Sequence, residues 1–380
     1  MYPGVYRGGW LMRVAVLTPE LDGAYGWTRY ALDLSHVLVD QGIEIIALTQ
    51  PQPSLAEDIS WIADVRPVLP HLVPPTGSFL LRSLASALRV RRAVSDCDLL
   101  HVIAEPYTPL AMFAAGSRPV VVTAHGTYVP KTSQRRFVGM LYRWAYRRAH
   151  LIAVSNYTAE QVQAALPGIP VTVIRNGVHF ARFQQPALVP AKAGPTILAS
   201  GAVKPRKGLH VLIDAMAQVR DSIPNVQLII TGRQDDPGYL AQLQDQIAAL
   251  QLVQNVHLLG QIPEHELLGW YQHADVFALP TLNIGEKFEG FGLVFLEASA
   301  CGLPVIGTMG SGVQEAIIDG TTGLLVPQND VPALADAITC LLRDKTRREQ
   351  MGVAGRDYAR SQDWSAVAVR VFSLYQQLCT

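Results

Sequence analysis

The chain has 380 residues, of which 49% are hydrophobic, and its 31 lysines and arginines balance its 31 aspartates and glutamates. This length and apolar content are ample for buried cores and favour two domains over one. A net charge of zero argues against a nucleic-acid-binding protein, which normally carries a strong basic excess. It also argues against a purely electrostatic membrane anchor, although a local basic helix remains compatible with it.

The four cysteines are scattered, without a C-x-x-C pair or a histidine at ligand spacing. They are Cys97, Cys301, Cys340 and Cys379. This pattern predicts reduced thiols in a cytoplasmic protein. No His, Asp or Glu cluster has the spacing of a metal site, so we expect no bound metal and no cofactor. No apolar run reaches the length needed to span a bilayer.

Short apolar runs alternate with amphipathic helical stretches from Arg13 onward. Residues 1–11 lack periodicity and are interpreted as a loose extension, with Met12 a candidate for the true start. The expected strands are residues 13–18, 43–49, 99–103, 119–124, 150–154, 171–175, 196–200, 226–231, 256–259, 276–279, 304–306 and 323–326. The clearest expected helices are residues 28–39, 209–219, 240–250 and 331–342. Strands that are apolar on both faces and alternate with helices indicate parallel sheets covered on both sides.

The alternation pauses at residues 184–195, which contain three prolines and no apolar period. We interpret this stretch as a linker between two Rossmann-like, doubly wound α/β domains. The predicted domains are residues 12–185 and 186–363, with a C-terminal helix over 364–380 packing back on the first. Ligands bind beyond the carboxyl ends of such strands, so two domains facing each other are expected to enclose a cleft.

The richest candidate loop lies between the expected strand 276–279 and a helix over 293–301. Residues 289–292 read Glu-Gly-Phe-Gly, and glycines at a helix start let the backbone approach a ligand closely. The N–H groups and the positive end of the helix dipole suit a phosphate. Glu289 and Glu297 are suited to accept hydrogen bonds from sugar or ribose hydroxyls. The alternative is a capped surface helix with two solvated glutamates.

Three cations stand just before the helix that is expected from Leu209. They are Lys204, Arg206 and Lys207. The helix dipole disfavours positive charge at this position, so the arrangement lowers stability unless an anion binds there. A nucleotide diphosphate fits, with Lys207 or Arg206 offsetting the charge of the leaving group. The alternative is a solvated basic turn.

Three further loops follow strands and carry weaker signals. His125 stands next to a glycine at the end of the strand 119–124, where it can contact a ligand, although a histidine satisfied by backbone is commoner. The loop 21–27 contains Gly26 but lacks G-x-G-x-x-G spacing, which argues against an NAD site. The glycine-rich loop 307–312 is equally compatible with a plain turn and with ligand contact.

In their order along the chain, these segments resemble the retaining glycosyltransferases of family 4, which have two Rossmann-like domains in the GT-B architecture. The similarity spans nearly all of residues 13–380, and its most specific part is the E-x7-E motif, here Glu289 to Glu297. Supporting segments are residues 154–155, 174–178, 206–208, 302–305 and 319–326. The loop before Glu289 is similar to that of bacterial mannosyltransferases of the phosphatidylinositol-mannoside type.

The resemblance implies transfer of a hexose, with retention, from a nucleotide diphosphate sugar of the GDP-mannose or UDP-glucose type. The implied acceptor is a hydroxyl of a sugar, lipid or polysaccharide precursor. In catalysis, His125 approaches the donor sugar, Lys207 neutralises the departing diphosphate and Glu289 binds sugar hydroxyls, while Glu297 binds the ribose. The implied donor-binding residues are Gly26, Arg206, Gly290, Phe291, Gly292, Leu293, Val294 and Glu297. These roles fit electrostatic catalysis better than a nucleophilic carboxylate pair.

Three positions depart from the family pattern. Ala202 stands where arginine is usual, so Lys204 or Arg206 is a candidate for the missing charge. His179 stands where aspartate is common, and Tyr25 occupies one of the usually paired glycine positions in the first loop. Two alternatives therefore stay open: a sugar-nucleotide 2-epimerase on the same architecture, and a non-catalytic nucleotide-sugar-binding module.

Two basic helical stretches lie in the N-terminal domain, which in this family binds the acceptor. Residues 134–149 are basic and aromatic, and residues 79–94 are rich in arginine. The arginines of the second stretch are Arg82, Arg89, Arg91 and Arg92. They suggest a lipid-linked acceptor and peripheral contact with an anionic membrane, at its inner face for a cytoplasmic protein. The alternative is that the apolar faces are core and the arginines are solvated.

Overall fold

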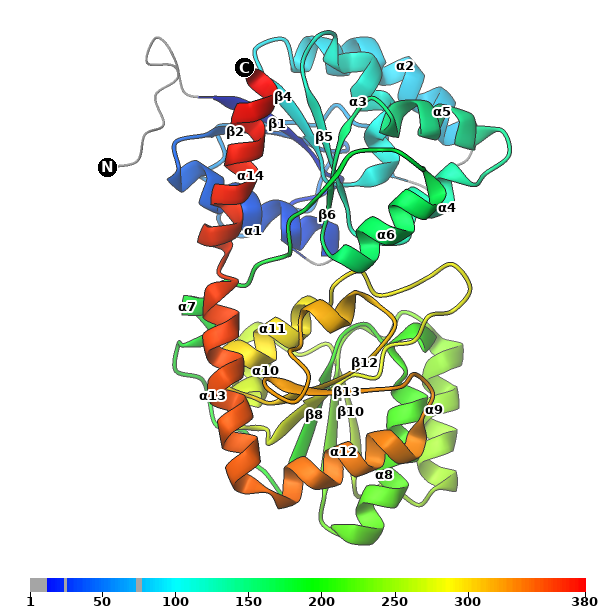
Figure 1. Cartoon of the computed structure of the whole chain (residues 1–380), viewed down its shortest axis with the longest axis vertical. Helices are drawn as coiled ribbons and strands as arrows, with labels where there is room; N and C mark the ends of the chain where they lie inside the picture. The colour runs from blue at the N-terminus through cyan, green and yellow to red at the C-terminus, as the bar shows by residue number, and fades with distance from the viewer. Residues whose placement is uncertain (1–11, 24–25, 73–76) are drawn as a thin grey trace. The chain divides into compact units, whose positions relative to one another are not determined.

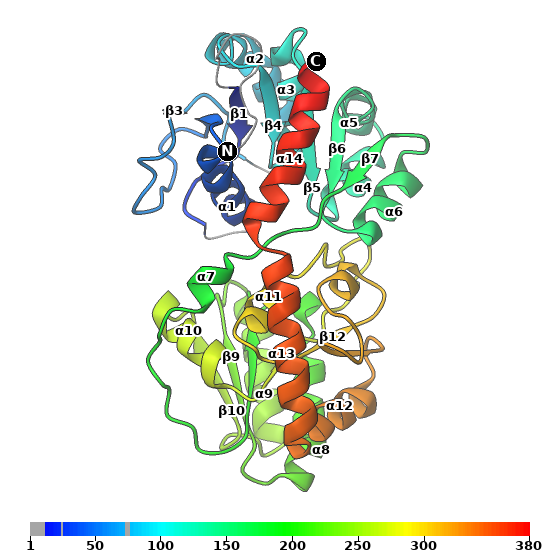
Figure 2. The ribbon, with the colours of Figure 1, turned by 60° about the vertical axis from the view of Figure 1, so that its left-hand side comes forward.

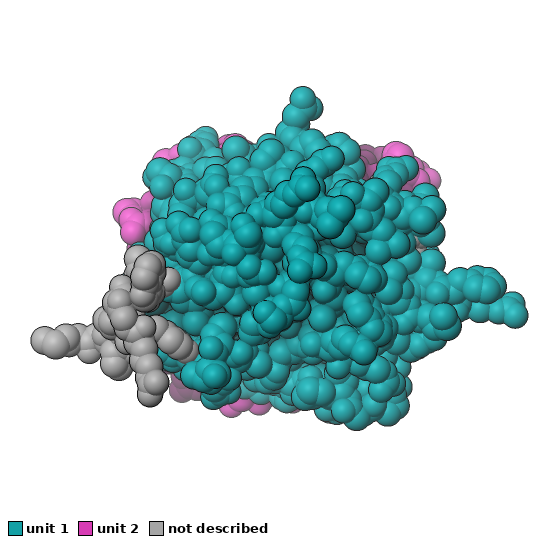
Figure 3. All heavy atoms as spheres, turned by 90° about the horizontal axis from the view of Figure 1, so that it is seen from above, with its two compact units in different colours: residues 1–176, 364–380 teal, residues 177–363 magenta. Residues whose placement is uncertain are grey.

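The computed structural model describes residues 12–23, 26–72 and 77–380, which form two compact units. Unit 1 comprises Met1–Asn176 and Trp364–Thr380, and unit 2 comprises Gly177–Asp363; Figure 3 colours them teal and magenta. The expectation of a loose extension over residues 1–11 lies outside the described residues, as does the departure at Tyr25. Within the described ranges, no helix is both long and apolar enough to cross a membrane.

The described part of unit 1 is built on a sheet of seven parallel strands in the order β3-β2-β1-β4-β5-β6-β7. The strands are β1 (Arg13–Leu17), β2 (Glu44–Leu48), β3 (Asp64–Arg66), β4 (Leu99–Val102), β5 (Val120–Ala124), β6 (His150–Ala153) and β7 (Val171–Val173). The chain winds outward from β1 to β3 and returns on the other side of β1 as β4. The switch point of this sheet, where ligands bind in doubly wound folds, therefore lies between β1 and β4.

Helices cover both faces of this sheet (Figures 1 and 2). One layer contains α2 (Gly77–Ala93), α3 (Thr108–Ala115), α4 (Tyr128–Ser133), α5 (Val138–Tyr146) and α6 (Asn156–Ala165), and a short 3-10 helix, η1 (Glu105–Tyr107), precedes α3. Phe79 of α2, Leu110 of α3 and Tyr142 of α5 are fully buried in one core with the strands. Helices α1 (Gly26–Asp40) and α14 (Trp364–Cys379) pack together on the opposite face.

A buried polar chain fixes the C-terminal helix α14 to unit 1. Nδ1 of His101 on β4 lies 2.6 Å from the hydroxyl of Tyr375, and Nε2 lies 2.7 Å from Oγ1 of Thr123. Burial lowers the pKa of His101 to about 3, so the ring is neutral and offers one donor and one acceptor. Trp364, at the start of α14, packs edge-on against Tyr30 of α1. These contacts account for the return of residues 364–380 to unit 1.

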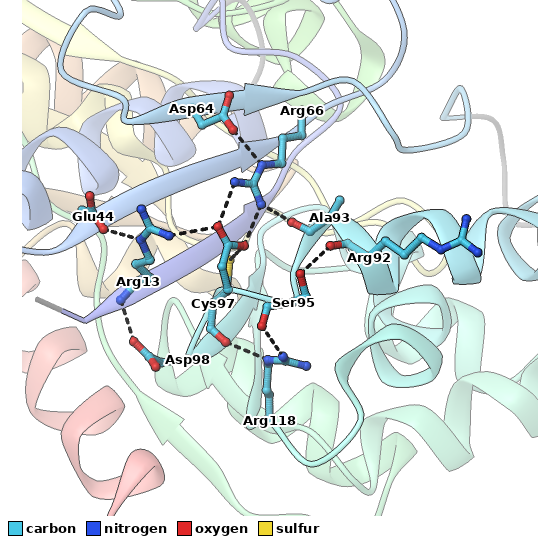
Figure 4. Close-up of polar contacts among 11 residues, drawn as sticks. Arg13, Glu44, Asp64, Arg66, Arg92, Ala93, Ser95, Cys97, Asp98 and Arg118 are labelled. Carbon is cyan, nitrogen blue, oxygen red and sulfur yellow. Dashed lines mark hydrogen bonds and ion pairs between the residues drawn. The ribbon is translucent and has the colours of Figure 1, made fainter. Parts of the chain in front are cut away.

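Charged side chains join the amino-terminal edge of the same sheet (Figure 4). Asp96, just before β4, accepts hydrogen bonds from Arg13 at 2.9 Å and from Arg66 at 2.8 and 3.0 Å. The hydrogen bonds from Arg66 lower the pKa of Asp96 to about 2, against its partial burial. Glu44 pairs with the other side of Arg13. Because this edge is opposite the carboxyl ends of the strands, we interpret the cluster as joining β1, β3 and β4 rather than binding a ligand.

The described part of unit 2 has six parallel strands in the order β10-β9-β8-β11-β12-β13. The strands are β8 (Thr196–Ser200), β9 (Gln227–Thr231), β10 (Val256–Gly260), β11 (Val276–Ala278), β12 (Val305–Thr308) and β13 (Gly323–Val326). The helices are α7 (Phe180–Phe183), α8 (Leu209–Ser222), α9 (Pro237–Ala249), α10 (Glu264–His273), α11 (Leu293–Ala300), α12 (Val331–Arg343) and α13 (Lys345–Ser361), with 3-10 helices η2 (Pro205–Lys207) and η3 (Gly312–Glu315). Helices α8, α9 and α12 cover one face and α10, α11 and α13 the other (Figure 1).

The prediction of two parallel α/β sheets is confirmed, and every expected strand is present. Strand β3 was not predicted, because Asp64–Arg66 is short, charged and largely unburied. The strand end expected at residue 306 is wrong, since β12 continues to Thr308. A continuous helix over 134–149 is also wrong: α5 begins only at Val138, after a turn that brings Gly139 so close to the Ser133 carbonyl that a side chain would not fit.

The boundary between the units falls between Asn176 and Gly177, earlier than the expected boundary after residue 185. The residues between these points contact unit 2. The N–H of Val178 donates to the Gln362 carbonyl at 3.0 Å, Phe183 packs edge-on against Tyr271, and the side chain of Gln184 donates to the Ala300 carbonyl at 2.7 Å. The change of unit therefore precedes the proline-rich stretch.

Candidate functional site

The candidate site of unit 2 lies at the switch point of its sheet. The chain winds from β8 out to β10 and returns beside β8 as β11. The cationic loop 201–208 follows β8, and the loop 279–292 follows β11, so both stand beyond the carboxyl ends of adjacent strands. This is the location at which doubly wound sheets bind ligands.

Backbone contacts hold these two loops together. Gly208 has a φ of +66°, and a side chain there would lie 1.8 Å from the Pro280 carbonyl oxygen, so only glycine permits the approach. The N–H of Leu282 donates to the Arg206 carbonyl at 2.8 Å. A third loop, after β12, joins them through the N–H of Gly312, which donates to the Glu289 carbonyl at 2.9 Å.

Three predicted residues meet at one carboxylate. Oε2 of Glu289 accepts a hydrogen bond from Arg206 at 2.6 Å and another from Lys207 at 2.7 Å. The side chains of Glu289 and Lys207 are only 14% and 11% exposed. Within the described residues, no hydrogen bond reaches Oε1 of Glu289, so this oxygen is left for a further donor. Arg206, rather than Lys204, brings the second cation to the site.

Burial and ion pairing together set the charges of Glu289, Arg206 and Lys207 (the Glu289 triad). Burial raises the pKa of Glu289, but Lys207 and Arg206 outweigh it and lower that pKa to about 2. Burial lowers the pKa of Lys207, against the attraction of Glu289. Two cations with one carboxylate leave an excess positive charge at the switch point, which favours an anionic ligand.

Helix α11 begins beside this triad without a side-chain cap. Gly292 precedes it with a φ of +86°, and a side chain at this position would clash with the ring of Phe295. Gly290 and Phe291 are buried, whereas Leu293 and Val294 are partly exposed. An uncapped helix start offers N–H groups to a phosphate, as the sequence predicts.

Glu297 is held by a tyrosine that sequence reasoning missed. The hydroxyl of Tyr271 on α10 donates to Oε2 of Glu297 at 2.9 Å. Tyr271 is buried, and Ser200, the last residue of β8, also bonds its hydroxyl. Nothing in the spacing of the sequence connects Tyr271 with Glu297, because helix packing alone brings them together.

The two predicted residues of unit 1 follow β1 and β5, at the carboxyl edge of that sheet, and Gly26 is the one beside the switch point. His125 follows β5, and its backbone N–H donates to Oε1 of Glu105 at 2.9 Å. Its ring packs edge-on against Tyr30. Gly26, the first residue of α1, is exposed and has open space where a side chain would stand. Sequence reasoning missed Glu105, although the rule that selected His125 applies equally to this residue after β4.

Within the described residues, no three His, Cys, Asp or Glu side chains gather in a way that could hold a metal ion. His179, at a position where the family often has aspartate, precedes α7 as its N-cap residue. Neither His179 nor Ala202 belongs to the Glu289 triad.

Comparison with known proteins agrees with this arrangement. Residues 181–358 match the family model described as glycosyl transferases group 1, and residues 25–182 match that of glycosyltransferase family 4. A phosphatidyl-myo-inositol mannosyltransferase of Mycobacterium leprae is 33% identical, over 97% of this chain and 98% of its own. A GDP-mannose-dependent alpha-(1-6)-phosphatidylinositol monomannoside mannosyltransferase of Mycolicibacterium smegmatis is 32% identical, over 76% of this chain and 79% of its own.

The fold is shared with solved glycosyltransferase structures. Sucrose-phosphate synthase from Thermosynechococcus elongatus matches with a TM-score of 0.80 and 25% identity, covering 97% of this chain and 99% of that one. Two doubly wound units, one with a cationic loop and a carboxylate at its switch point, define an enzyme of the GT-B glycosyltransferase class. The chain belongs to glycosyltransferase family 4. The relatives described here are mannosyltransferases by name and give no support to the 2-epimerase alternative.

The triad yields a prediction about the ligand-free protein. Glu289→Gln leaves Lys207 and Arg206 without their counter-charge in a largely buried place. We expect the unfolding free energy of unit 2 to fall by roughly 1–3 kcal/mol, measured by chemical denaturation without ligand. Glu286→Gln, an exposed change in the same loop, is the matched control. Equal stabilities of the two variants would show that the triad does not hold these loops.

Proposed function

We propose that the enzyme transfers mannose, with retention, from GDP-mannose to a hydroxyl of phosphatidylinositol or of a phosphatidylinositol mannoside. The observation that carries this proposal is the Glu289 carboxylate between Lys207 and Arg206 at the switch point of unit 2. The donor and acceptor are suggested by the names of relatives that are 33% and 32% identical.

The triad supports separate roles for its residues in binding and in catalysis. When the bond between the sugar and the diphosphate breaks, negative charge grows on the diphosphate. We propose that Lys207 and Arg206 offset this charge. The unoccupied Oε1 of Glu289 can accept a hydrogen bond from a sugar hydroxyl while Oε2 keeps both cations in place. Glu297, fixed by Tyr271, is proposed to accept hydrogen bonds from the ribose hydroxyls.

The donor proposal predicts a specific product and a specific defect. With GDP-mannose and phosphatidylinositol vesicles, the protein should form mannosylated lipid, detected by mass spectrometry. Lys207→Ala should lower kcat about a hundredfold and change KM far less, because leaving-group charge is largest in the transition state. Equal effects on kcat and KM would contradict this role. Product formed only from UDP-glucose, or an epimerised sugar without an acceptor, would contradict the proposed reaction.

We also propose that unit 1 contacts an anionic membrane through α2 and α5. Leu81, Leu84 and Leu88 form one stripe along α2 and are 69%, 41% and 70% exposed. The arginines of α2 are exposed beside this stripe. Phe137, immediately before α5, is 83% exposed, and Met140 is 68% exposed. Helices α2 and α5 both pack on α3, so they belong to the same layer of unit 1.

Exposed leucines with neighbouring arginines suit the interface of an anionic bilayer, where apolar side chains insert and cations meet phosphates. The double variant Leu81→Ser with Leu88→Ser should lose co-sedimentation with phosphatidylinositol-containing vesicles at low salt. Val253→Ser with Val353→Ser removes two exposed apolar side chains from unit 2 and should leave it unchanged. Failure of the unaltered protein to bind such vesicles would contradict the membrane contact.

A further inference from the structure

A side-chain amide after β13 joins the loops that follow three strands of unit 2. Oε1 of Gln328 accepts a hydrogen bond from the backbone N–H of Asn283 at 2.7 Å, and its Nε2 donates to the Met309 carbonyl at 2.8 Å. The side chain of Asn283 in turn donates to the Gly310 carbonyl at 2.7 Å. These hydrogen bonds form a closed ring (the Gln328 ring) between residues that follow β11, β12 and β13, which are neighbours in the sheet.

An amide suits both contacts at position 328. The N–H of Asn283 needs an acceptor and the Met309 carbonyl needs a donor, so the two partners fix which way the amide of Gln328 lies. A carboxylate lacks the donor, and an apolar side chain lacks both groups. The turn that orients Gln328 is itself fixed, because Asn329 has a φ of +58° and Asp330 caps α12.

The loop that contains Asn283 also carries Glu289, and both of its ends are fastened to the loop after β12. Near its start, Oγ1 of Thr308 donates to the Thr281 carbonyl at 2.5 Å, and both threonines are buried. Near its end, the N–H of Gly312 donates to the Glu289 carbonyl at 2.9 Å. The Gln328 ring is therefore one of several contacts that set where this loop lies.

An exposed turn separates Asn283 from Phe288 and Glu289. In this turn, the N–H of Ile284 donates to the Lys287 carbonyl at 2.9 Å, and the N–H of Lys287 donates to the Ile284 carbonyl at 3.0 Å. Phe288 is buried, whereas the residues of the turn are exposed. Because an exposed turn has few core contacts to hold it, the hydrogen bonds of Asn283 at its base fix its position, and with it the backbone that leads to Glu289.

We propose that Gln328 is a positioning residue for the donor sugar, which fixes the loop that presents Oε1 of Glu289. Oε2 is already held by Arg206 and Lys207, whereas the direction of Oε1 also depends on the backbone that carries the side chain. The binding of a sugar hydroxyl by Oε1 rests on the proposed function.

The two supports of Glu289 act on different parts of the donor. The cations of the Glu289 triad are proposed to offset the charge of the diphosphate, and the Gln328 ring is built from other residues. Loss of the ring should therefore spare the affinity for GDP and weaken the additional affinity that the sugar provides. A residue needed only for the folding of unit 2 would weaken both ligands alike.

The test is Gln328→Met, because methionine has the length of glutamine without its amide. Calorimetric titration of GDP and of GDP-mannose, without acceptor, measures the two affinities separately. We expect the variant to bind GDP-mannose roughly three- to tenfold more weakly, the value of a net hydrogen bond, and GDP within about twofold of the unaltered enzyme. Gln242→Met makes the same change at an exposed position of α9 and should alter neither affinity.

A double-variant cycle connects the effect with Glu289. Glu289→Ala removes the carboxylate, so adding Gln328→Met should not lower the ratio of the GDP-mannose affinity to the GDP affinity any further. A further fall of this ratio would overturn the assignment. If Gln328→Met does not fold, Gln328→Glu keeps the acceptor for the Asn283 N–H and should lower the ratio less. If Glu289→Ala does not fold, the ratio in Gln328→Met decides alone.

The same titrations separate this proposal from the proposed function. Equal weakening of GDP and GDP-mannose in Gln328→Met would indicate a merely structural role and overturn the proposal, as would unchanged affinities for both. Absence of GDP and GDP-mannose binding in the unaltered enzyme would contradict the proposed function, and the assignment with it. Normal binding of both ligands by the unaltered enzyme, with the same ratio in Gln328→Met, would contradict the assignment of Gln328 alone.

Discussion

The candidate site of unit 2 depends on one carboxylate that is shared by two cations. Glu289 is the last charged residue before α11, and its Oε2 bonds both Arg206 and Lys207 in a largely buried place. A lone lysine so deeply buried would tend to lose its charge, and a lone glutamate would tend to gain a proton. Lys207 and Arg206 keep Glu289 ionised, and Glu289 in turn favours the charged form of Lys207.

The ion pairs of Glu289 depend on the position of two loops in the fold. The cations follow β8 and the carboxylate follows β11, which are neighbours in the sheet although they are far apart in sequence. Gly208 allows the two loops to touch, since any side chain would collide with the Pro280 carbonyl. The excess positive charge then faces the edge of the sheet where parallel strands leave room for a ligand. In the proposed reaction, an anionic leaving group offsets this excess positive charge.

The sequence predicts most of the strands and the start of α11. Apolar runs such as 226–231 are long enough and regular enough to predict buried strands, and the E-x7-E motif located the start of α11. The charged strand Asp64–Arg66 was not readable, because it is held by ion pairs with Asp96 and not by burial of an apolar run. The boundary after Asn176 was also missed, since the proline-rich stretch is more conspicuous than the contacts of Val178 and Phe183 with unit 2.

In the candidate site too, some residues could be predicted from local sequence and others only from the fold. Glu289 on one loop and Arg206 and Lys207 on another were predicted separately from sequence. The structure brings these two loops together. Tyr271 and Glu105 were not selected, because each acts through a partner that only folding supplies: Glu297 for Tyr271, and His125 for Glu105. Both are buried, and only the fold reveals their hydrogen-bond partners.

Lys207 is proposed to bind the diphosphate of the donor. Calorimetric titration of GDP and GMP into the unaltered enzyme and into Lys207→Ala tests it most directly, because the two nucleotides differ by the β-phosphate alone. We expect the unaltered enzyme to prefer GDP by roughly ten- to hundredfold, the value of a charge-assisted hydrogen bond, and Lys207→Ala to lose most of this preference. An undiminished preference for GDP in Lys207→Ala would contradict it.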